Sequence, residues 1–186
     1  QHRGRSRSRR RQQGIQVASL VGYTNAGKSS LLNKLTGAGV TTQNKLFTTL
    51  DPVTKRVRLP SGRNILFTDT VGFIQNLPSH IIAAFRATLE EIVESTLLIH
   101  VVDIINPRAA EQVHEVEKVL SELNSSHKLC IMALNKIDLL EKPLDLMKQN
   151  KPKEHPAVFI SASQGTGLND LLKLVDTEIT QSDKQC

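Results

Sequence analysis

Short, continuously apolar runs alternate along this chain with longer amphipathic stretches. The apolar runs are rich in valine, isoleucine and leucine, which is typical of strands covered on both faces of a sheet. They are Val17–Val21, Asn64–Asp69, Leu97–Asp103, Leu129–Asn135 and Ala157–Ser161. The stretches between them that predict helices are Ser29–Leu35, Ile81–Glu94, Glu111–Leu123 and Leu168–Ile179. This alternation predicts an α/β domain with a mostly parallel sheet flanked by helices, whose ligands bind at the carboxyl ends of the strands.

One stretch has a different pattern. From Val53 to Leu59, apolar residues alternate with polar ones, as in a strand with one solvated face. Pro60, Ser61 and Gly62 then supply a turn signal before the next apolar run. We therefore expect one antiparallel strand at the edge of the sheet.

The segment between the first strand and the first helix carries the strongest chemical signal. It reads Gly-x-x-x-x-Gly-Lys-Ser, a phosphate-binding loop, in the strand–loop–helix context that this motif requires. Its backbone N–H groups can point at phosphate oxygens, Lys28 brings a positive charge to the β- and γ-phosphates, and the Ser29 hydroxyl is a Mg²⁺ ligand. The alternative is a chance glycine-rich turn. The residues predicted to contact nucleotide here are Gly22, Tyr23, Thr24, Asn25, Ala26, Gly27, Lys28, Ser29 and Ser30.

A second motif, Asp-x-x-Gly, closes the strand that follows the expected turn. At a strand end beside the phosphate loop, the Asp69 carboxylate can hold Mg²⁺ through water. The backbone N–H of Gly72 can reach the γ-phosphate.

The third motif, Asn-Lys-x-Asp, points to guanine. The Asp138 carboxylate can accept hydrogen bonds from both N1–H and the exocyclic amino group of guanine, an arrangement that adenine lacks. Lys136 can lie along the base, and Asn135 can tie this loop to the phosphate loop. A polar helix cap is the alternative. A later tripeptide suits a loop that supports the guanine O6, and consists of Ser161, Ala162 and Ser163.

A candidate switch segment lies between the first helix and the edge strand, at residues 44–52. A threonine there can ligate Mg²⁺ and contact the γ-phosphate only when GTP is bound. We assign this role to Thr49, with Thr48 as the alternative, and an ordinary loop as the competing interpretation. The metal ligands predicted are thus Ser29, Thr49 and Asp69.

Composition and charge narrow the class of protein. The chain has 186 residues, of which 39% are hydrophobic, 23% charged and only 3% aromatic. This is an ordinary globular mixture for one domain, and too poor in aromatics for a single-strand binder that stacks on bases. Two cysteines exclude a disulfide framework and favour a reducing compartment. No apolar run reaches the roughly 18 residues of a membrane span.

The net charge of +6 is confined to one end. Residues 1–14 contain six arginines and no acid, and the remaining 18 basic residues balance 18 acidic ones. We therefore divide the chain into an arginine-rich arm (1–14), a GTP-binding domain (15–181) and a C-terminal tail (182–186). The arm is interpreted either as a solvated linker or as a contact to RNA phosphates.

These motifs, in this order, resemble those of the HflX family of ribosome-associated GTPases, within the translation-factor-related class. The resemblance extends from Ile15 to Ile179 and is carried by Val21–Ser29, Phe47–Pro52, Asp69–Ile74, Phe85–Glu91 and His100–Asp103. Family members carry an N-terminal domain ahead of an arginine-rich linker. Because that domain is absent from this sequence, which begins with Gln1, we interpret the chain as a fragment or a processed product.

The resemblance adds several expectations. The family usually has a small residue at the position of Thr48, which supports Thr49 as the switch threonine. Phe73 stands where many GTPases have a glutamine that orients the attacking water, so basal hydrolysis should be slow. In cation-dependent relatives, an asparagine at the position of Asn25 helps to hold K⁺. Ser30 and the segment 104–106 look similar to the organellar branch, which suggests a mitochondrial homologue.

The sequence therefore predicts a P-loop molecular switch that binds GTP or GDP with Mg²⁺ and acts on ribosomes, in splitting, rescue or biogenesis. We expect an intracellular monomer, mitochondrial or cytoplasmic, with no membrane partner. The residues expected to act in hydrolysis are Lys28, Thr49, Gly72 and Asn25. Two alternatives are a phosphotransferase acting on a metabolite and an RNA-binding module with a vestigial nucleotide site.

Overall fold

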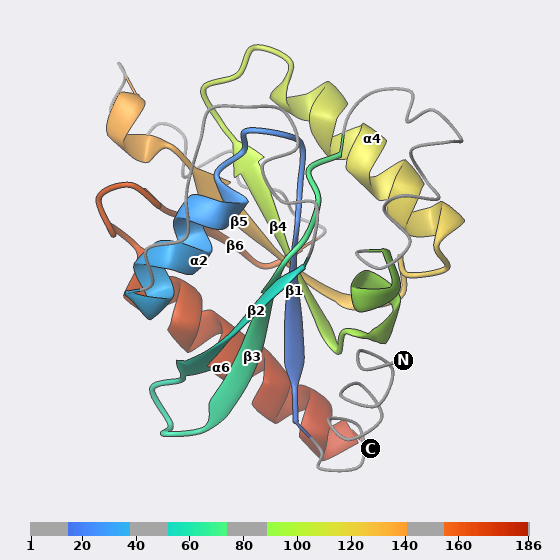
Figure 1. Cartoon of the computed structure of the whole chain (residues 1–186), viewed down its shortest axis with the longest axis vertical. Coiled ribbons are helices and arrows are strands. Elements are labelled where there is room, and N and C mark those ends of the chain that lie inside the picture. The colour runs from blue at the N-terminus through green and yellow to red at the C-terminus, as the bar shows by residue number, and fades with distance from the viewer. Residues whose placement is uncertain (1–14, 38–51, 74–88, 141–154, 186) are drawn as a thin grey trace.

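The computed structural model describes residues 15–37, 52–73, 89–140 and 155–185. These residues form a six-stranded sheet in the order β2-β3-β1-β4-β5-β6 (Figure 1). The strands are β1 (Val17–Val21), β2 (Val53–Arg58), β3 (Asn64–Asp69), β4 (Leu97–Asp103), β5 (Leu129–Asn135) and β6 (Ala157–Phe159). β2 is antiparallel to β3, and the other pairings of this sheet are parallel. The predicted architecture, with an antiparallel strand at one edge, is confirmed.

Helices cover both faces of the sheet. On one face, α2 (Lys28–Thr36) and α6 (Leu168–Gln185) pack against the main core cluster. On the other face, α4 (Ala109–Glu122) contributes Val116 and Leu120 to a second cluster (Figure 1). Residues 89–94 are also helical and place Ile92 in that second cluster. Because both faces are covered, the central strand β1 is buried along its whole length.

The boundaries of three elements differ from the prediction by two residues or more. β6 ends at Phe159 rather than Ser161, because Ser161 already belongs to a turn. The Ser161 N–H donates within this turn to the carbonyl of Thr166. α4 begins at Ala109, before the predicted Glu111. α6 runs to Gln185, so residues 182–185, expected to form a tail, are helical. Of the predicted helix 81–94, only residues 89–94 lie within the described part of the chain.

Side-chain contacts join α6 to the β2–β3 hairpin, and one of them lies in the part of α6 that extends beyond Ile179. The Ser61 backbone N–H and hydroxyl donate to the two carboxylate oxygens of Asp176, at 2.7 and 2.8 Å. Two turns further along the helix, Asp183 pairs with Arg63 at 2.7 Å and accepts a hydrogen bond from Gln16. We refer to these contacts as the hairpin clamp.

Within the described residues, no helix is long and apolar enough to span a bilayer.

Candidate functional site

The phosphate-binding loop connects β1 to α2 at the carboxyl edge of the parallel sheet. Its turn depends on left-handed backbone at Asn25 (φ 61°) and Gly27 (φ 103°). A Cβ at Gly27 would lie 2.3 Å from the Asn135 amide nitrogen, so the close approach of these two loops requires glycine. Lys28 then opens α2, with no acidic residue in the first turn of that helix. The loop thus presents backbone N–H groups and a helix N-terminus to the same space, an arrangement suited to anions.

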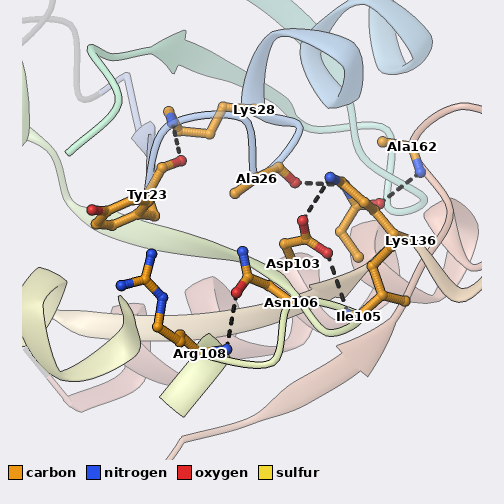
Figure 2. A network of polar contacts seen from close by, with 10 residues as sticks. Tyr23, Ala26, Lys28, Asp103, Ile105, Asn106, Arg108, Lys136 and Ala162 are labelled. Carbon is orange, nitrogen blue, oxygen red and sulfur yellow. Dashed lines mark hydrogen bonds and ion pairs between the residues drawn. The ribbon is translucent and has the colours of Figure 1, made fainter. Parts of the chain in front are cut away.

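Lys28 is buried, and its ammonium folds back over the loop (Figure 2). The Nζ donates to the carbonyls of Gly22 and Tyr23, at 3.1 and 3.0 Å. Burial lowers the pKa of Lys28 to about 8, although the nearby Asp69 carboxylate opposes this shift. An anionic ligand would supply negative charge to this buried cation and raise its pKa again.

Ser29 and Asp69 come together in front of the loop. The Ser29 hydroxyl donates to Asp69 Oδ2 at 2.5 Å. Strand pairing fixes this geometry, because Asp69 lies opposite Leu20 near the end of β1. A hydroxyl and a carboxylate are the hard oxygen donors that Mg²⁺ prefers, so this pair fits the predicted metal. The described residues hold no group of three or more metal-binding side chains, so the remaining ligands would be phosphate oxygens, waters and the predicted Thr49, which lies outside the described residues.

The Asp-x-x-Gly segment is hydrogen bonded to the phosphate loop. Thr24 N–H donates to the Phe73 carbonyl at 2.8 Å, and Phe73 N–H donates to the Gly22 carbonyl at 3.1 Å. A Cβ at Gly72 would lie 2.7 Å from Thr24 Cα and 3.1 Å from the Lys28 ammonium. Gly72 is therefore in direct contact with the loop that would hold the phosphates.

The Phe73 side chain takes no part in this polar site. It is buried to 1% exposure in the cluster formed with Val21, Ile92 and Leu98. The ring is thus an anchor in the apolar core. This placement agrees with the expectation that residue 73 supplies no group to orient water.

Asn135 joins three loops at the other side of the site. Its Nδ2 donates to the Ala26 carbonyl at 2.8 Å, and its Oδ1 accepts from the Ala162 N–H at 2.9 Å (Figure 2). The side chain is only 2% exposed, so both contacts are shielded from water. The predicted connection between the Asn-Lys-x-Asp motif and the phosphate loop is present.

The predicted base-recognition carboxylate lies beside the small-residue loop. Ser163 donates to Asp138 Oδ2 at 3.0 Å, and the hydroxyls of Ser161 and Ser163 are 3.0 Å apart. Hydrogen bonding by Ser161, and to a smaller extent by Ser163, lowers the pKa of Asp138 against the opposing effect of desolvation. The carboxylate is therefore ionised at neutral pH, as an acceptor for two N–H donors must be.

One residue at this edge was not predicted from the sequence to belong to the site. Asp103, at the end of β4, pairs with Lys136, with 2.6 Å between Oδ2 and Nζ. Its position after a buried strand, within a segment that carried the family resemblance, is the signal that could have found it.

Two titratable side chains belong to the core, and two sets of predicted residues are outside the described part of the chain. His100 is buried, and burial lowers its pKa to about 3. Burial raises the pKa of the Cys130 thiol to about 12, so both side chains are neutral core residues. Thr48 and Thr49 lie outside the described residues, as does the arginine-rich arm.

Comparison with known proteins identifies the family. A family profile described as "50S ribosome-binding GTPase" matches residues 17–136, which include the phosphate loop, Asp69 and Asn135. The chain belongs to this family. The phosphate loop, Asp69 and Asn135 therefore lie in the part of the chain that matches the 50S ribosome-binding GTPases.

Individual relatives within the GTPases agree with this assignment. GTPase HflX of Caldanaerobacter subterraneus subsp. tengcongensis is 45% identical over 178 residues, which are 96% of this chain and 40% of that protein. The corresponding values for GTPase HflX of Escherichia coli are 39% identity, 96% and 42%. The chain therefore spans about two fifths of the length of these HflX proteins.

A solved structure shares the fold closely. A GTP-binding protein from the archaeon Sulfolobus solfataricus, in complex with GDP, matches with a TM-score of 0.71 and 32% identity. The match covers 91% of this chain and 54% of that one. Era in complex with MgGDPNP and nucleotides of 16S ribosomal RNA matches with a TM-score of 0.67 and 26% identity, over 87% and 55% of the two chains.

Proposed function

We propose that this chain is the guanine-nucleotide domain of an HflX-type GTPase, which binds GTP with Mg²⁺, hydrolyses it slowly and acts as a switch on the ribosome. The observation that carries the proposal is the position of Asn135. One buried side chain hydrogen bonds to the phosphate loop through Ala26 and to the small-residue loop through Ala162. The phosphate loop and the small-residue loop, which we expect to bind opposite ends of one nucleotide, are thereby held at a fixed separation.

Each part of the edge then has a chemical task. The loop N–H groups and Lys28 neutralise phosphate charge, and the Gly72 N–H contacts the γ-phosphate and reports its presence. Ser29 and, through water, Asp69 would hold Mg²⁺, which would supply further neutralisation of the phosphate charge. This metal assignment is supported by the 2.5 Å contact between the two side chains, and by the Mg²⁺-containing complex of the relative Era.

Hydrolysis requires a water molecule that attacks the γ-phosphate. Residue 73 cannot orient it, because the Phe73 ring is buried in the core. We therefore expect slow basal turnover, with faster turnover when another group completes the site. One such group is K⁺ held beside Asn25, where it would offset charge developing between the β- and γ-phosphates.

GTP turnover by the whole chain tests the enzymatic part. We expect phosphate release from GTP that depends on Mg²⁺ and is undetectable with ATP. A phosphotransferase acting on a metabolite would instead need an acceptor before it consumed nucleotide. An RNA-binding module with a vestigial site would bind RNA without turnover.

The ribosomal part rests on the family and on charge. The family is described as 50S ribosome-binding, and the relative Era has been solved with ribosomal RNA. The six arginines of residues 1–14 are suited to phosphates, and binding that releases counterions weakens steeply with salt. Co-sedimentation with purified subunits should show more binding with a GTP analogue than with GDP. A chain that begins at Ile15 should bind more weakly and keep this nucleotide preference.

The proposal also covers the oligomeric state and the cellular location of the protein. We expect the domain to act as a monomer, which light scattering with each nucleotide would check. We expect it in the cytoplasm or the mitochondrion, since its cysteine content favours a reducing compartment. Localisation of a fluorescent fusion to the full-length protein would distinguish the two.

A further inference from the structure

Asp103 occupies a specific place at the edge of the sheet. It ends β4 and lies opposite Asn135, the last residue of β5, in the parallel register. The next residue, Ile104, donates its N–H to the Asn135 carbonyl at 3.2 Å. Figure 2 shows the Asp103 carboxylate beside Lys136, with dashed contacts to Lys136 and to Ile105.

The carboxylate has two partners of different kinds. One oxygen lies 2.6 Å from the Lys136 ammonium, and the other accepts a hydrogen bond from the Ile105 N–H at 3.3 Å. The Asp103 side chain is 12% exposed and that of Lys136 is 28% exposed, so the pair is shielded more than an ordinary surface ion pair. The backbone contact orients the carboxylate, and the carboxylate in turn orients the lysine.

Lys136 needs such an anchor. Its backbone is left-handed (φ 74°), an uncommon conformation for a residue with a side chain. A free lysine also samples many rotamers, which a ligand would have to restrict on binding. Holding the ammonium at one point fixes the four-carbon stem in advance.

We propose that Asp103 is a positioning residue for guanine-nucleotide binding that acts through Lys136. By holding the ammonium, it fixes the aliphatic stem of Lys136 as an apolar platform for the flat face of the base. The proposal rests on the proposed function, and it separates two tasks: Asp138 recognises the edge of the base, and the Asp103–Lys136 pair supports its face. Asp103 itself is engaged by Lys136 and Ile105, so its effect on the base is indirect.

The division of tasks can be tested with two nucleotides. IDP has the same ring system as GDP but lacks the exocyclic amino group that Asp138 would recognise. Calorimetry of the full chain should show that Asp103→Asn weakens GDP and IDP by the same factor, about 10-fold. Asp138→Asn should instead reduce the preference for GDP over IDP. Asp103→Glu, which keeps the charge, should recover part of the lost affinity.

A second pair of variants tests the route through Lys136. In a Lys136→Met background, which keeps an apolar stem without the charge, Asp103→Asn should cause no further loss. The matched control is Asp170→Asn, which removes the carboxylate of another Asp–Lys contact, 3.7 Å from Lys173 and exposed on α6. It should leave both affinities unchanged.

Three results would overturn the proposal. The first is an unchanged GDP affinity in Asp103→Asn. The second is an equal loss of GDP affinity from Asp103→Asn in the wild type and in the Lys136→Met background. The third is a change in the ratio of GDP to IDP affinity in Asp103→Asn. In each case tight GDP binding by the wild type would leave the proposed function intact. If the wild type bound ADP as tightly as GDP, or neither, the proposed function and this inference would both fall. Melting temperatures of the nucleotide-free variants, with Asp103→Glu as second variant, separate loss of fold from loss of positioning.

Discussion

Aspartate side chains form polar networks at two places in this domain, and the two networks are built differently. At the carboxyl edge of the sheet, Asp103 and Asp138 contact residues of irregular loops, and the backbone there includes left-handed residues such as Lys136. In the hairpin clamp, Asp176 and Asp183 project from one face of a regular helix onto a hairpin turn. Strained backbone beside polar groups is typical of binding sites, whereas contacts between regular elements hold a fold together.

The comparison implies a separation of effects. Substitutions at the carboxyl edge should change ligand binding more than stability. Substitutions in the hairpin clamp should do the reverse.

Replacing Lys28 should have the largest effect. Lys28→Met removes the buried cation that would neutralise phosphate charge, and we expect a loss of GDP affinity of about 100-fold or more. The nucleotide-free protein should melt at the same temperature or higher, because burial of the charged amine opposes folding below pH 8. Calorimetry and thermal unfolding measure the two effects. Retained affinity would remove the phosphate-site assignment.

Asp138→Asn should change which base is bound. The variant loses a charge-assisted acceptor for two guanine donors, so GTP should bind about 30- to 100-fold more weakly. The introduced amide can donate to the extra carbonyl of xanthine, and XTP should gain affinity. Competition binding between GTP and XTP measures the exchange. A variant that still prefers GTP would show that another group reads the base.

The pH dependence of binding provides an independent measure of Lys28. Because its folded pKa is about 8, below the ordinary 10.5, the positive charge is present below pH 8 and is lost as the pH rises through that value. GDP affinity should therefore decline above pH 8, by at most about 10-fold per pH unit. Binding near pH 8 should take up protons, which calorimetry in buffers of different ionisation enthalpy detects. Affinity independent of pH between 7 and 9.5 would contradict this.

In the hairpin clamp, Asp176→Ala should destabilise the fold without changing nucleotide affinity. It removes the acceptor of two hydrogen bonds from Ser61, and we expect the free energy of unfolding to fall by about 1–2 kcal/mol. Asp170→Ala is the matched control on the same helix, since its carboxylate is 70% exposed and should contribute little. Denaturant unfolding and GDP titration of both variants make the comparison. An Asp176→Ala variant with weakened GDP binding and normal stability would reverse the roles of the two networks.

The smallest effect concerns the monovalent cation. If K⁺ assists hydrolysis beside Asn25, turnover should be several-fold faster in K⁺ than in Na⁺, and Asn25→Ala should lose this difference. Stability should fall only slightly, because Asn25 is exposed but alanine is disfavoured in its left-handed backbone conformation. Single-turnover GTP hydrolysis in the two salts measures it, and equal rates would leave Asn25 with a role in loop shape only.

Much of this edge follows from the sequence because its motifs stand at the ends of continuous apolar runs. In a parallel sheet, such strand ends meet at one edge, so the proximity of Asp69, Asn135 and the phosphate loop could be predicted. The same argument could have brought Asp103 to this edge, but its pairing with Lys136 depends on the register between β4 and β5, which the sequence does not reveal. The burial of Phe73 depends likewise on which helices cover that face.

The extension of α6 beyond Ile179 likewise could not be predicted from the sequence. Its last turn contains mostly polar residues, so the periodic apolar pattern that predicts helices ends early. The helix continues where Asp183 contacts Arg63 and Gln16, two residues distant in the sequence. Tertiary contacts of this kind leave no periodic signal.

Calorimetric titration with guanine and adenine nucleotides shows whether this edge of the sheet is a guanine site. The full chain, with Mg²⁺, would be titrated with GDP and with ADP by calorimetry. If Asp138 and the loops joined by Asn135 form a guanine site, GDP should bind more than about 100-fold more tightly than ADP, because adenine lacks the two donors that the Asp138 carboxylate would accept. Equal affinity for the two nucleotides would show that this edge is not a guanine site.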